Sequence, residues 1–154
     1  MTTMAGDWHR TLRRYLVLSI GLHLLWEVGQ LPLYTIWTTA PLPRQVFAIA
    51  HCTLGDAMIA GLSLLIALTI AGSPAWPAER SHTVWIITIA LGLTYTIYSE
   101  WLNVNVRGSW AYAPSMPTLP WLGTGLTPLL QWLLVPSLAL RFARRTSSGI
   151  LRAF

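Results

Sequence analysis

The chain has 154 residues, of which 54% are hydrophobic and only 10% are charged, and its formal net charge at pH 7 is +5. An ordinary soluble domain carries about 25% charged residues, so these charges are too few to cover a surface that faces water. The basic residues are all arginines that flank apolar segments, which argues against nucleic-acid binding. A lone cysteine, Cys52, excludes an internal disulfide framework and a CxxC metal site. We therefore expect a small integral membrane protein whose main partner is the lipid bilayer.

Four apolar segments are long enough to cross a hydrocarbon core, which takes about 20 helical residues. They cover approximately residues 15–33, 46–71, 83–102 and 121–140. Each connection contains prolines, which end helices because proline cannot donate the next backbone hydrogen bond. The chain has no internal repeat and no low-complexity tract. The sequence thus predicts a single all-α domain over residues 1–154, built as an antiparallel bundle of four transmembrane helices.

The arginines predict the orientation of this bundle. One side of the four-span arrangement would hold eight of the ten: Arg10, Arg13, Arg14, Arg80, Arg141, Arg144, Arg145 and Arg152. Only Arg44 and Arg107 would lie on the other side. Because cytoplasmic loops carry the excess of arginine and lysine, we expect both termini in the cytoplasm. The expected location is a cell membrane of the bacterial inner-membrane type, with several passes of the chain.

Three of the five acidic residues, Glu27, Asp56 and Glu100, fall inside predicted spans. A carboxylate at bilayer depth costs about 2.5 to 3.5 kcal/mol on insertion scales, so such groups are expected to face the bundle interior and to mark a functional site. The helical rise of about 1.5 Å per residue places all three between mid-depth and the extracytoplasmic face. We therefore expect a polar pocket in the outer half of the bundle.

Polar side chains form one stripe on each predicted span at this depth. His23, Glu27 and Gln30 are spaced i, i+4 and i+7, which is one face of a helix. The other three stripes are Cys52 with Asp56, Thr96 with Glu100 and Asn103, and Thr124 with Thr127 and Gln131. His51 lies about 140° around its helix from Asp56, so it is expected to flank the site from another angle.

The candidate residues divide by expected role. The catalytic candidates are His23, Glu27, Asp56 and Glu100, and the substrate-binding candidates are Gln30, Asn103, Arg107 and Gln131. Small residues are expected to let the helices approach one another closely, namely Gly21, Gly55, Gly61 and Gly92.

The first interpretation of these residues is a membrane enzyme or binding protein for a hydrophobic small molecule. Carboxyl groups away from water hold a proton to higher pH than in water, so they can donate it near neutrality. The His23–Glu27 pair on one helix, with Glu100 on another, resembles the membrane sterol isomerases at those three residues. That resemblance implies proton transfer on a hydrophobic substrate and requires no cofactor.

Two other interpretations remain open. Two histidines and three carboxylates suit zinc, iron or manganese, with His51 joining His23, Glu27, Asp56 and Glu100 as ligands. Intramembrane acids and histidines also occur in proton relays of carriers and redox complexes. Because four spans are few for a complete transporter, the proton-relay interpretation implies a homo-oligomer or a larger membrane complex.

The connection over residues 103–120 is expected to act as a lid or binding loop on the outer face. Within it, Arg107 is expected to pair with Glu100 or to hold an anionic headgroup or carboxylate. Its aromatic residues Trp110 and Tyr112, with Trp121, are expected to anchor the protein at the membrane interface.

Overall fold

The computed structural model describes residues 3–148. Within this range, the regular structure is helical, apart from two isolated β-bridges. The elements in chain order are α1 (Thr3–Gln30), the 3₁₀ turn η1 (Leu31–Leu33), α2 (Ile36–Thr39), α3 (Leu42–Ala71), α4 (Ser81–Glu100), the π-helical segment η2 (Trp101–Val106) and α5 (Leu126–Ser148).

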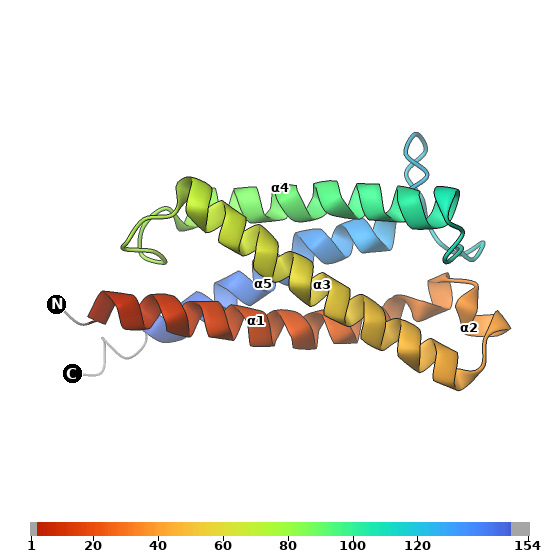
Figure 1. Ribbon diagram of the computed structural model, residues 1–154, viewed down its shortest axis with the longest axis horizontal. Coiled ribbons are helices and arrows are strands. Elements are labelled where there is room, and N and C mark those ends of the chain that lie inside the picture. Colours follow the sequence, from red (N-terminus) through yellow and green to blue (C-terminus); the bar gives the residue numbers. More distant parts are fainter. Residues whose placement is uncertain (1–2, 149–154) are drawn as a thin grey trace.

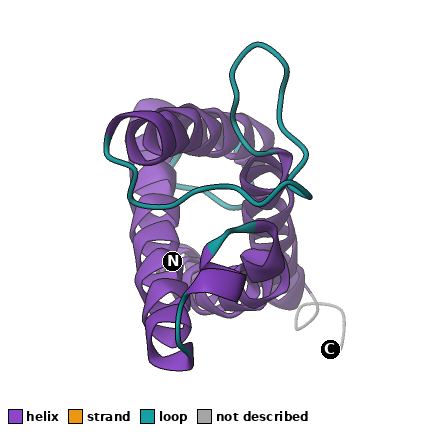
Figure 2. Ribbon diagram, turned by 90° about the vertical axis from the view of Figure 1, so that its right-hand side faces the viewer, coloured by secondary structure: helices purple, strands orange, loops and turns teal. Residues whose placement is uncertain are grey.

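The long helices α1, α3, α4 and α5 form a bundle in which α1 and α4 each pack against both α3 and α5 (Figures 1 and 2). Helix α1 begins and α5 ends at the same end of the bundle, here called the terminal end (Figure 1). The opposite end, where α3 begins and α4 ends, is called the pocket end. Helix α3 crosses the bundle obliquely, so it lies beside α4 near the terminal end and diverges from it toward the pocket end (Figure 1).

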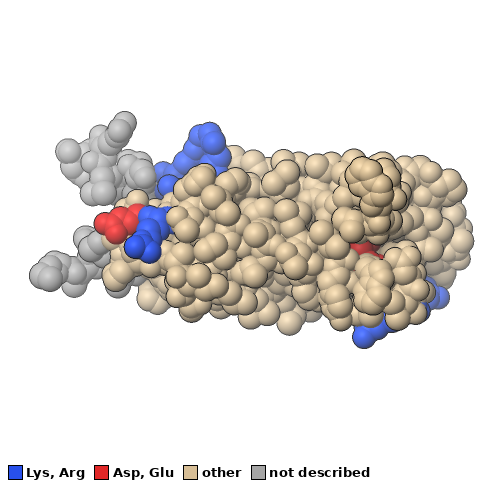
Figure 3. All heavy atoms as spheres, turned by 90° about the horizontal axis from the view of Figure 1, so that it is seen from above, with Lys and Arg blue, Asp and Glu red and all other residues tan. Residues whose placement is uncertain are grey.

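Among the residues that the structure describes, three helical segments are long and apolar enough to cross a membrane: Trp8–Leu33, Leu42–Ala71 and Leu126–Arg145. Helix α4 has 20 residues, but its serines, threonines, histidine and glutamate lower its hydropathy. The outward faces of the bundle carry large apolar side chains, such as Leu25, which is 71% exposed. Figure 3 shows arginines gathered at the two ends and an uncharged belt between them. This surface is compatible with a location in a membrane.

Small and apolar side chains form the core, which lies mainly toward the terminal end. It includes Ala60, Leu64 and Ala67 of α3 and Ala139 and Ala143 of α5, all of them fully buried or nearly so. Alanines at these positions allow the helix backbones to approach closely, as small residues do between membrane helices. This half of the bundle thus holds the helices together mainly by apolar packing, and its buried polar groups include the hydroxyls of Thr11, Ser19 and Thr88.

The four glycines that were predicted to allow close helix approach fall into two groups by the space around them. A Cβ at Gly92 would lie 2.1 Å from Cε3 of Trp132, so only glycine fits between α4 and α5, and Gly61 meets Leu16 at 3.3 Å. A Cβ at Gly21 or Gly55 would meet nothing within 4 Å. The prediction of close helix approach was therefore wrong for these last two positions.

The helix limits differ from the predicted spans where proline is involved. Pro43 lies in the first turn of α3 and Pro128 in the first turn of α5, where the missing N–H has no partner in the helix to lose. Proline therefore opens these helices, and α3 begins four residues before the predicted span. After α4, η2 continues the helical path through residues that the sequence suggested to be a loop.

The connection between η2 and α5 is hydrogen-bonded to the segment that joins α1 to α2. The backbone N–H of Thr35 donates to the carbonyl of Ala111 at 3.0 Å, and that of Ala113 donates to the carbonyl of Leu33 at 2.9 Å. Tyr34 and Tyr112 form an isolated antiparallel bridge between these hydrogen bonds. As a result, part of this connection crosses the pocket end of the bundle (Figure 2).

Candidate functional site

A buried polar cluster joins three helices in the half of the bundle nearer the pocket end. Its centre is the amide of Gln131 on α5, whose Nε2 lies 2.8 Å from Asp56 Oδ2, 3.1 Å from Glu27 Oε1 and 2.9 Å from His23 Nδ1. Asp56 comes from α3, whereas His23 and Glu27 come from α1. Gln131 is 2% exposed and His23 is completely buried, whereas the side chain of Asp56 is 17% exposed.

Gln30 extends the cluster along α1. Its Nε2 donates to Glu27 Oε1 at 2.8 Å and to Gln131 Oε1 at 3.3 Å, and its Oε1 accepts from Trp26 Nε1 at 3.2 Å. Spacings of three and four residues on a helix put these side chains within reach of one another. We call His23, Glu27, Gln30, Asp56 and Gln131 the Gln131 cluster.

The acceptors in this cluster outnumber the hydrogens that Gln131 can offer. A primary amide carries two hydrogens, but Nε2 of Gln131 faces three acceptor atoms. In addition, His23 Nδ1 lies 3.4 Å from Asp56 Oδ2. The missing donor is supplied when the imidazole of His23 carries its ring hydrogen on Nδ1, which then faces Asp56 Oδ2, or when a carboxyl group carries a hydrogen. The hydrogen-bonding roles within the cluster therefore depend on where these hydrogens lie.

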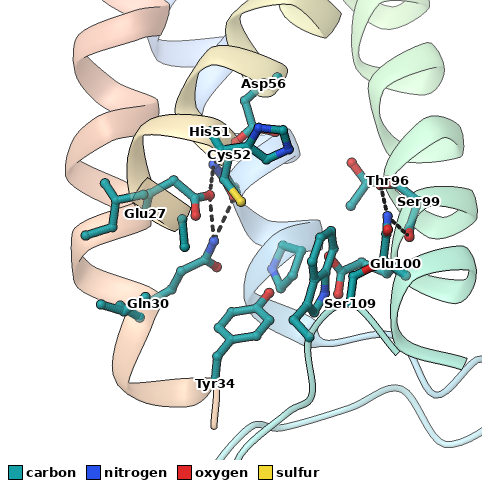
Figure 4. A pocket seen from close by; sticks show the side chains of 18 of the residues that line it. Glu27, Gln30, Tyr34, His51, Cys52, Asp56, Thr96, Ser99, Glu100 and Ser109 are labelled. Atoms are coloured by element: carbon teal, nitrogen blue, oxygen red, sulfur yellow. Dashed lines mark hydrogen bonds between the residues drawn. The ribbon is translucent and has the colours of Figure 1, made fainter. Parts of the chain in front are cut away.

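The Gln131 cluster borders a cavity of about 590 Å³ that lies between α3 and the pocket end of α4. Figure 4 shows Glu27 and Asp56 on one side of this cavity and Thr96, Ser99 and Glu100 of α4 on the other. Among the lining residues, Phe47 of α3 is 68% exposed and Tyr95 of α4 is 45% exposed. Since these two side chains belong to the diverging helices, the cavity opens sideways between α3 and α4. Acidic atoms lie in a hollow near the pocket end in Figure 3.

Glu100 has a different environment from the other two carboxyl groups. The hydroxyl of Tyr112 donates to Glu100 Oε2 and accepts from the backbone N–H of Gly125 at 2.9 Å. Burial, and then the neighbouring Glu100, raise the pKa of Tyr112 above its ordinary value, so its hydroxyl remains a donor at neutral pH. Tyr112 thus joins α4 to the loop and to the residues that lead into α5.

The remaining candidates line the same cavity without joining the Gln131 cluster. Asn103 Nδ2 in η2 donates to the carbonyl of Ser99 in the preceding α4 at 2.9 Å. His51 is exposed, and its ring stacks on that of Phe47 with 5.7 Å between the centroids. Arg107 is exposed and, among the described residues, forms no ion pair with Glu100. The structure therefore brings five candidates into one network and places the other four around it.

Metal coordination is not supported by this geometry. Among the residues that the structure describes, no group of three or more histidine, cysteine, aspartate and glutamate side chains is arranged to hold a metal ion. The N–H groups of Gln131 point at the carboxylates, where a cation would otherwise bind. His51, which the zinc, iron or manganese interpretation needed as a ligand, shares no hydrogen bond with the cluster in the described part of the chain.

Some residues at the site were not among the sequence candidates, and Trp26, Tyr112 and Arg44 are three examples. Trp26 lies four residues before Gln30, a spacing from which the contact is predictable on a helix. Tyr112 was expected only as an interfacial anchor, and its contact with Glu100 depends on the path of the loop, which no periodicity reveals. Arg44 lines the cavity from the first turn of α3, and its position on the arginine-poor side was the available signal.

No protein-family model, curated protein or solved structure matches the chain. The chemistry of the site therefore rests on its own geometry.

Proposed function

We propose that the cavity binds a lipid-soluble small molecule and presents it to a proton-transfer site formed by His23, Glu27 and Asp56. The observation that carries this proposal is the Gln131 cluster, in which two carboxyl groups and an imidazole surround one amide at the side of an accessible cavity. Carboxyl and imidazole groups are the side chains that most often remove and donate protons in enzyme sites.

The volume and the lining of the cavity support a hydrophobic ligand. Its volume of about 590 Å³ falls within the range of about 300 to 1,000 Å³ that small-molecule sites occupy. Apolar and aromatic side chains such as Phe47, Ile59 and Tyr95 form part of its lining. Because the opening faces sideways between α3 and α4, a molecule dissolved in the bilayer reaches the Gln131 cluster without crossing an aqueous phase.

The two sides of the cavity supply different groups. His23 and Tyr112 do not line the cavity themselves, but His23 lies 3.4 Å from Asp56 and Tyr112 donates to Glu100. Glu27 and Asp56 line the cavity on the side of α1 and α3, whereas Glu100 lines it on the side of α4. A molecule held between them meets proton-transfer groups on both faces. This arrangement suits a reaction in which one group removes a proton and another returns it elsewhere. Gln131 acts as a positioning residue, because it holds both carboxyl groups of the cluster.

The proposal includes a membrane topology. In it, α4 is a fourth span, the terminal end faces the cytoplasm, and the cavity lies in the outer half of the bilayer. The support is the antiparallel order of the four long helices, together with the gathering of arginines at the terminal end. Backbone hydrogen bonding within a helix also makes α4 able to cross hydrocarbon despite its polar residues.

A proton path through the whole membrane is the competing function, and one observation favours the cavity over it. In the described half of the bundle toward the terminal end, the fully buried polar side chains include the hydroxyls of Thr11, Ser19 and Thr88. No carboxyl or imidazole group is buried there among the described residues. A relay that starts at the Gln131 cluster therefore meets no buried carboxyl or imidazole group in the described part of this half.

Analysis of co-purified small molecules tests the proposal. The protein is purified in a mild uncharged detergent, and bound compounds are extracted and identified by mass spectrometry. We expect the wild type to retain a hydrophobic compound that the double variant Glu27→Gln, Asp56→Asn loses. The matched control is Glu79→Gln, which alters an exposed acid in the connection at the terminal end. Equal retention by all three proteins, or retention by none, would contradict the proposal.

Infrared spectroscopy tests the proton itself. A carboxylic acid absorbs at a different frequency from a carboxylate, so a proton held by Glu27 or Asp56 gives a distinct carbonyl band. We expect this band in the wild type at neutral pH and a loss of its intensity in the double variant. An unchanged band in that variant would show that the proton resides outside the two side chains.

A further inference from the structure

Two arginines occupy the rim of the cavity. Arg44 lies in the first turn of α3 and Arg107 follows η2, and both side chains are exposed and line the cavity. Among the described residues, neither guanidinium forms an ion pair. The cavity carboxyl groups have other partners, because Glu27 and Asp56 accept from Gln131 and Glu100 accepts from Tyr112. The rim therefore carries positive charge that no described acidic side chain pairs with.

Their position runs against the general distribution of arginine in this chain. The other described arginines lie toward the terminal end, and the positive-inside tendency disfavours arginine on the opposite side. Two arginines on the rim of one cavity at the arginine-poor end call for a local explanation. Arginine suits anions in particular, because its planar guanidinium donates two parallel hydrogen bonds to a phosphate or a carboxylate.

We propose that Arg44 and Arg107 bind the anionic end group, a phosphate or a carboxylate, of the lipid-soluble molecule that occupies the cavity. This inference rests on the proposed function and specifies its substrate class. The anionic end lies at the rim beside the membrane surface, and the apolar body lies in the cavity alongside Phe47 and Tyr95. The carboxyl groups at the Gln131 cluster disfavour a second anion there, so the ligand presents an uncharged part to the proton-transfer site.

Charge therefore determines the direction of the ligand. The cavity is basic at its rim and acidic in its interior, so a molecule with one charged end has a single favourable orientation. The reverse orientation of the ligand would place its anionic end against Glu27 and Asp56, in surroundings where charge interactions are stronger than in water. A neutral molecule of the same length has no such preference.

Matched amphiphiles test this inference. Purified protein in an uncharged detergent is titrated with hexadecyl phosphate and with hexadecanol, and bound amphiphile is counted by native mass spectrometry. We expect hexadecyl phosphate to bind about tenfold more tightly than hexadecanol, since a charge-assisted contact contributes roughly that factor. The double variant Arg44→Gln, Arg107→Gln is expected to lose this advantage and to bind hexadecanol as the wild type does.

The control removes the same number of charges elsewhere. Arg13→Gln combined with Arg141→Gln changes two exposed arginines of α1 and α5 toward the terminal end, and we expect both amphiphiles to bind as in the wild type. Equal circular dichroism spectra and elution volumes show that all variants are folded. Inorganic phosphate at the same concentration is expected not to displace hexadecyl phosphate, and displacement would assign the site to a free anion.

The outcomes separate the two proposals. Equal affinity for both amphiphiles, with binding that depends on Glu27 and Asp56, would overturn the anion site and leave the proposed function standing. If neither amphiphile binds the wild type, both proposals are overturned. An equal loss in the control variant would attribute the effect to overall charge and would overturn the role of Arg44 and Arg107.

Discussion

One amide nitrogen connects three helices in this bundle. Nε2 of Gln131 reaches a carboxyl group on α1, a carboxyl group on α3 and the imidazole of His23, while Oε1 accepts from Gln30. A hydrogen bond to a charged group contributes about 1.5 to 3 kcal/mol, and an unsatisfied buried polar group costs a similar amount. The stability of the polar half of the bundle thus depends strongly on a single neutral side chain.

Replacement of Gln131 by leucine tests this dependence. Gln131→Leu keeps most of the volume but removes the shared donor, so we expect the free energy of unfolding to fall by about 1 to 3 kcal/mol. Thermal unfolding in detergent measures the change. The control is Gln45→Leu, whose amide contacts loop carbonyls beside solvent and whose loss is expected to cost about 1 kcal/mol or less. Equal stability of Gln131→Leu and wild type would show that the cluster holds together without its central amide.

Tyr112 links the loop to α4 in a pH-dependent way. Burial and Glu100 raise the pKa of Tyr112 above its ordinary value of 10.0, so the folded protein binds this proton more tightly than the unfolded chain does. The stabilisation by the protonated hydroxyl is therefore complete below the ordinary pKa and declines as the pH rises above it.

The variant Tyr112→Phe makes this pH dependence measurable. At pH 7 we expect its free energy of unfolding to be about 1 kcal/mol lower than that of the wild type, because the hydroxyl contacts with Glu100 and Gly125 are lost. Its unfolding temperature is expected to be lower as well. The difference in the free energy of unfolding between variant and wild type is expected to become smaller above pH 10. Tyr98→Phe, at an exposed tyrosine, serves as the control and is expected to match the wild type. A difference that is constant up to pH 11 would contradict the proposed role of the hydroxyl.

At the scale of the elements, the contact between α4 and α5 depends on Gly92. The indole of Trp132 lies against this glycine, and its ring centroid lies 5.4 Å from that of His23. Trp132 follows Gln131 in α5, so a displacement of the α5 backbone that relieves a clash at the indole also moves the amide at the centre of the cluster. The spacing of two helices and the geometry of the site are thus coupled through one residue without a side chain.

Two alanine substitutions separate close packing from helix propensity. Gly92→Ala places a methyl group into Trp132, and we expect a loss of about 1 to 3 kcal/mol from overpacking. Gly21→Ala faces open space, and we expect a gain of about 0.5 to 1 kcal/mol because alanine favours the helix. Thermal unfolding of the two variants in the same detergent decides the question, and a stabilised Gly92→Ala would contradict the described contact.

The sequence predicted the helical elements better than their ends or their connections. Periodicity placed His23, Glu27 and Gln30 on one face of α1, and in the structure all three side chains contact Gln131. Helical spacing could not reveal that Pro43 opens a helix, since proline fits a first turn as well as a connection. It also could not pair Glu100 with Tyr112, because that contact depends on how the intervening loop returns across the bundle.

For the whole molecule, the distribution of arginine predicts which end faces the cytoplasm. With Cys52→Ser as a cysteine-free background, a cysteine at Ser115 reports on the pocket-end loop and one at Ala78 on the connection between α3 and α4. We expect a membrane-impermeant maleimide to label Ser115→Cys in intact cells and Ala78→Cys only after permeabilisation. Labelling of both positions from the same side would exclude α4 as a span, and labelling of Ala78→Cys alone would invert the orientation.

For the bilayer ligand that we propose, a sideways opening between α3 and α4 would also determine how its affinity must be expressed. A ligand that arrives by lateral diffusion is sampled from a two-dimensional solution, so occupancy depends on its mole fraction among the lipids. Added lipid then lowers occupancy even when the total amounts of ligand and protein are constant. A compound with very low aqueous solubility can consequently saturate the cavity, and a dissociation constant quoted in molar units would change with the lipid content of each sample.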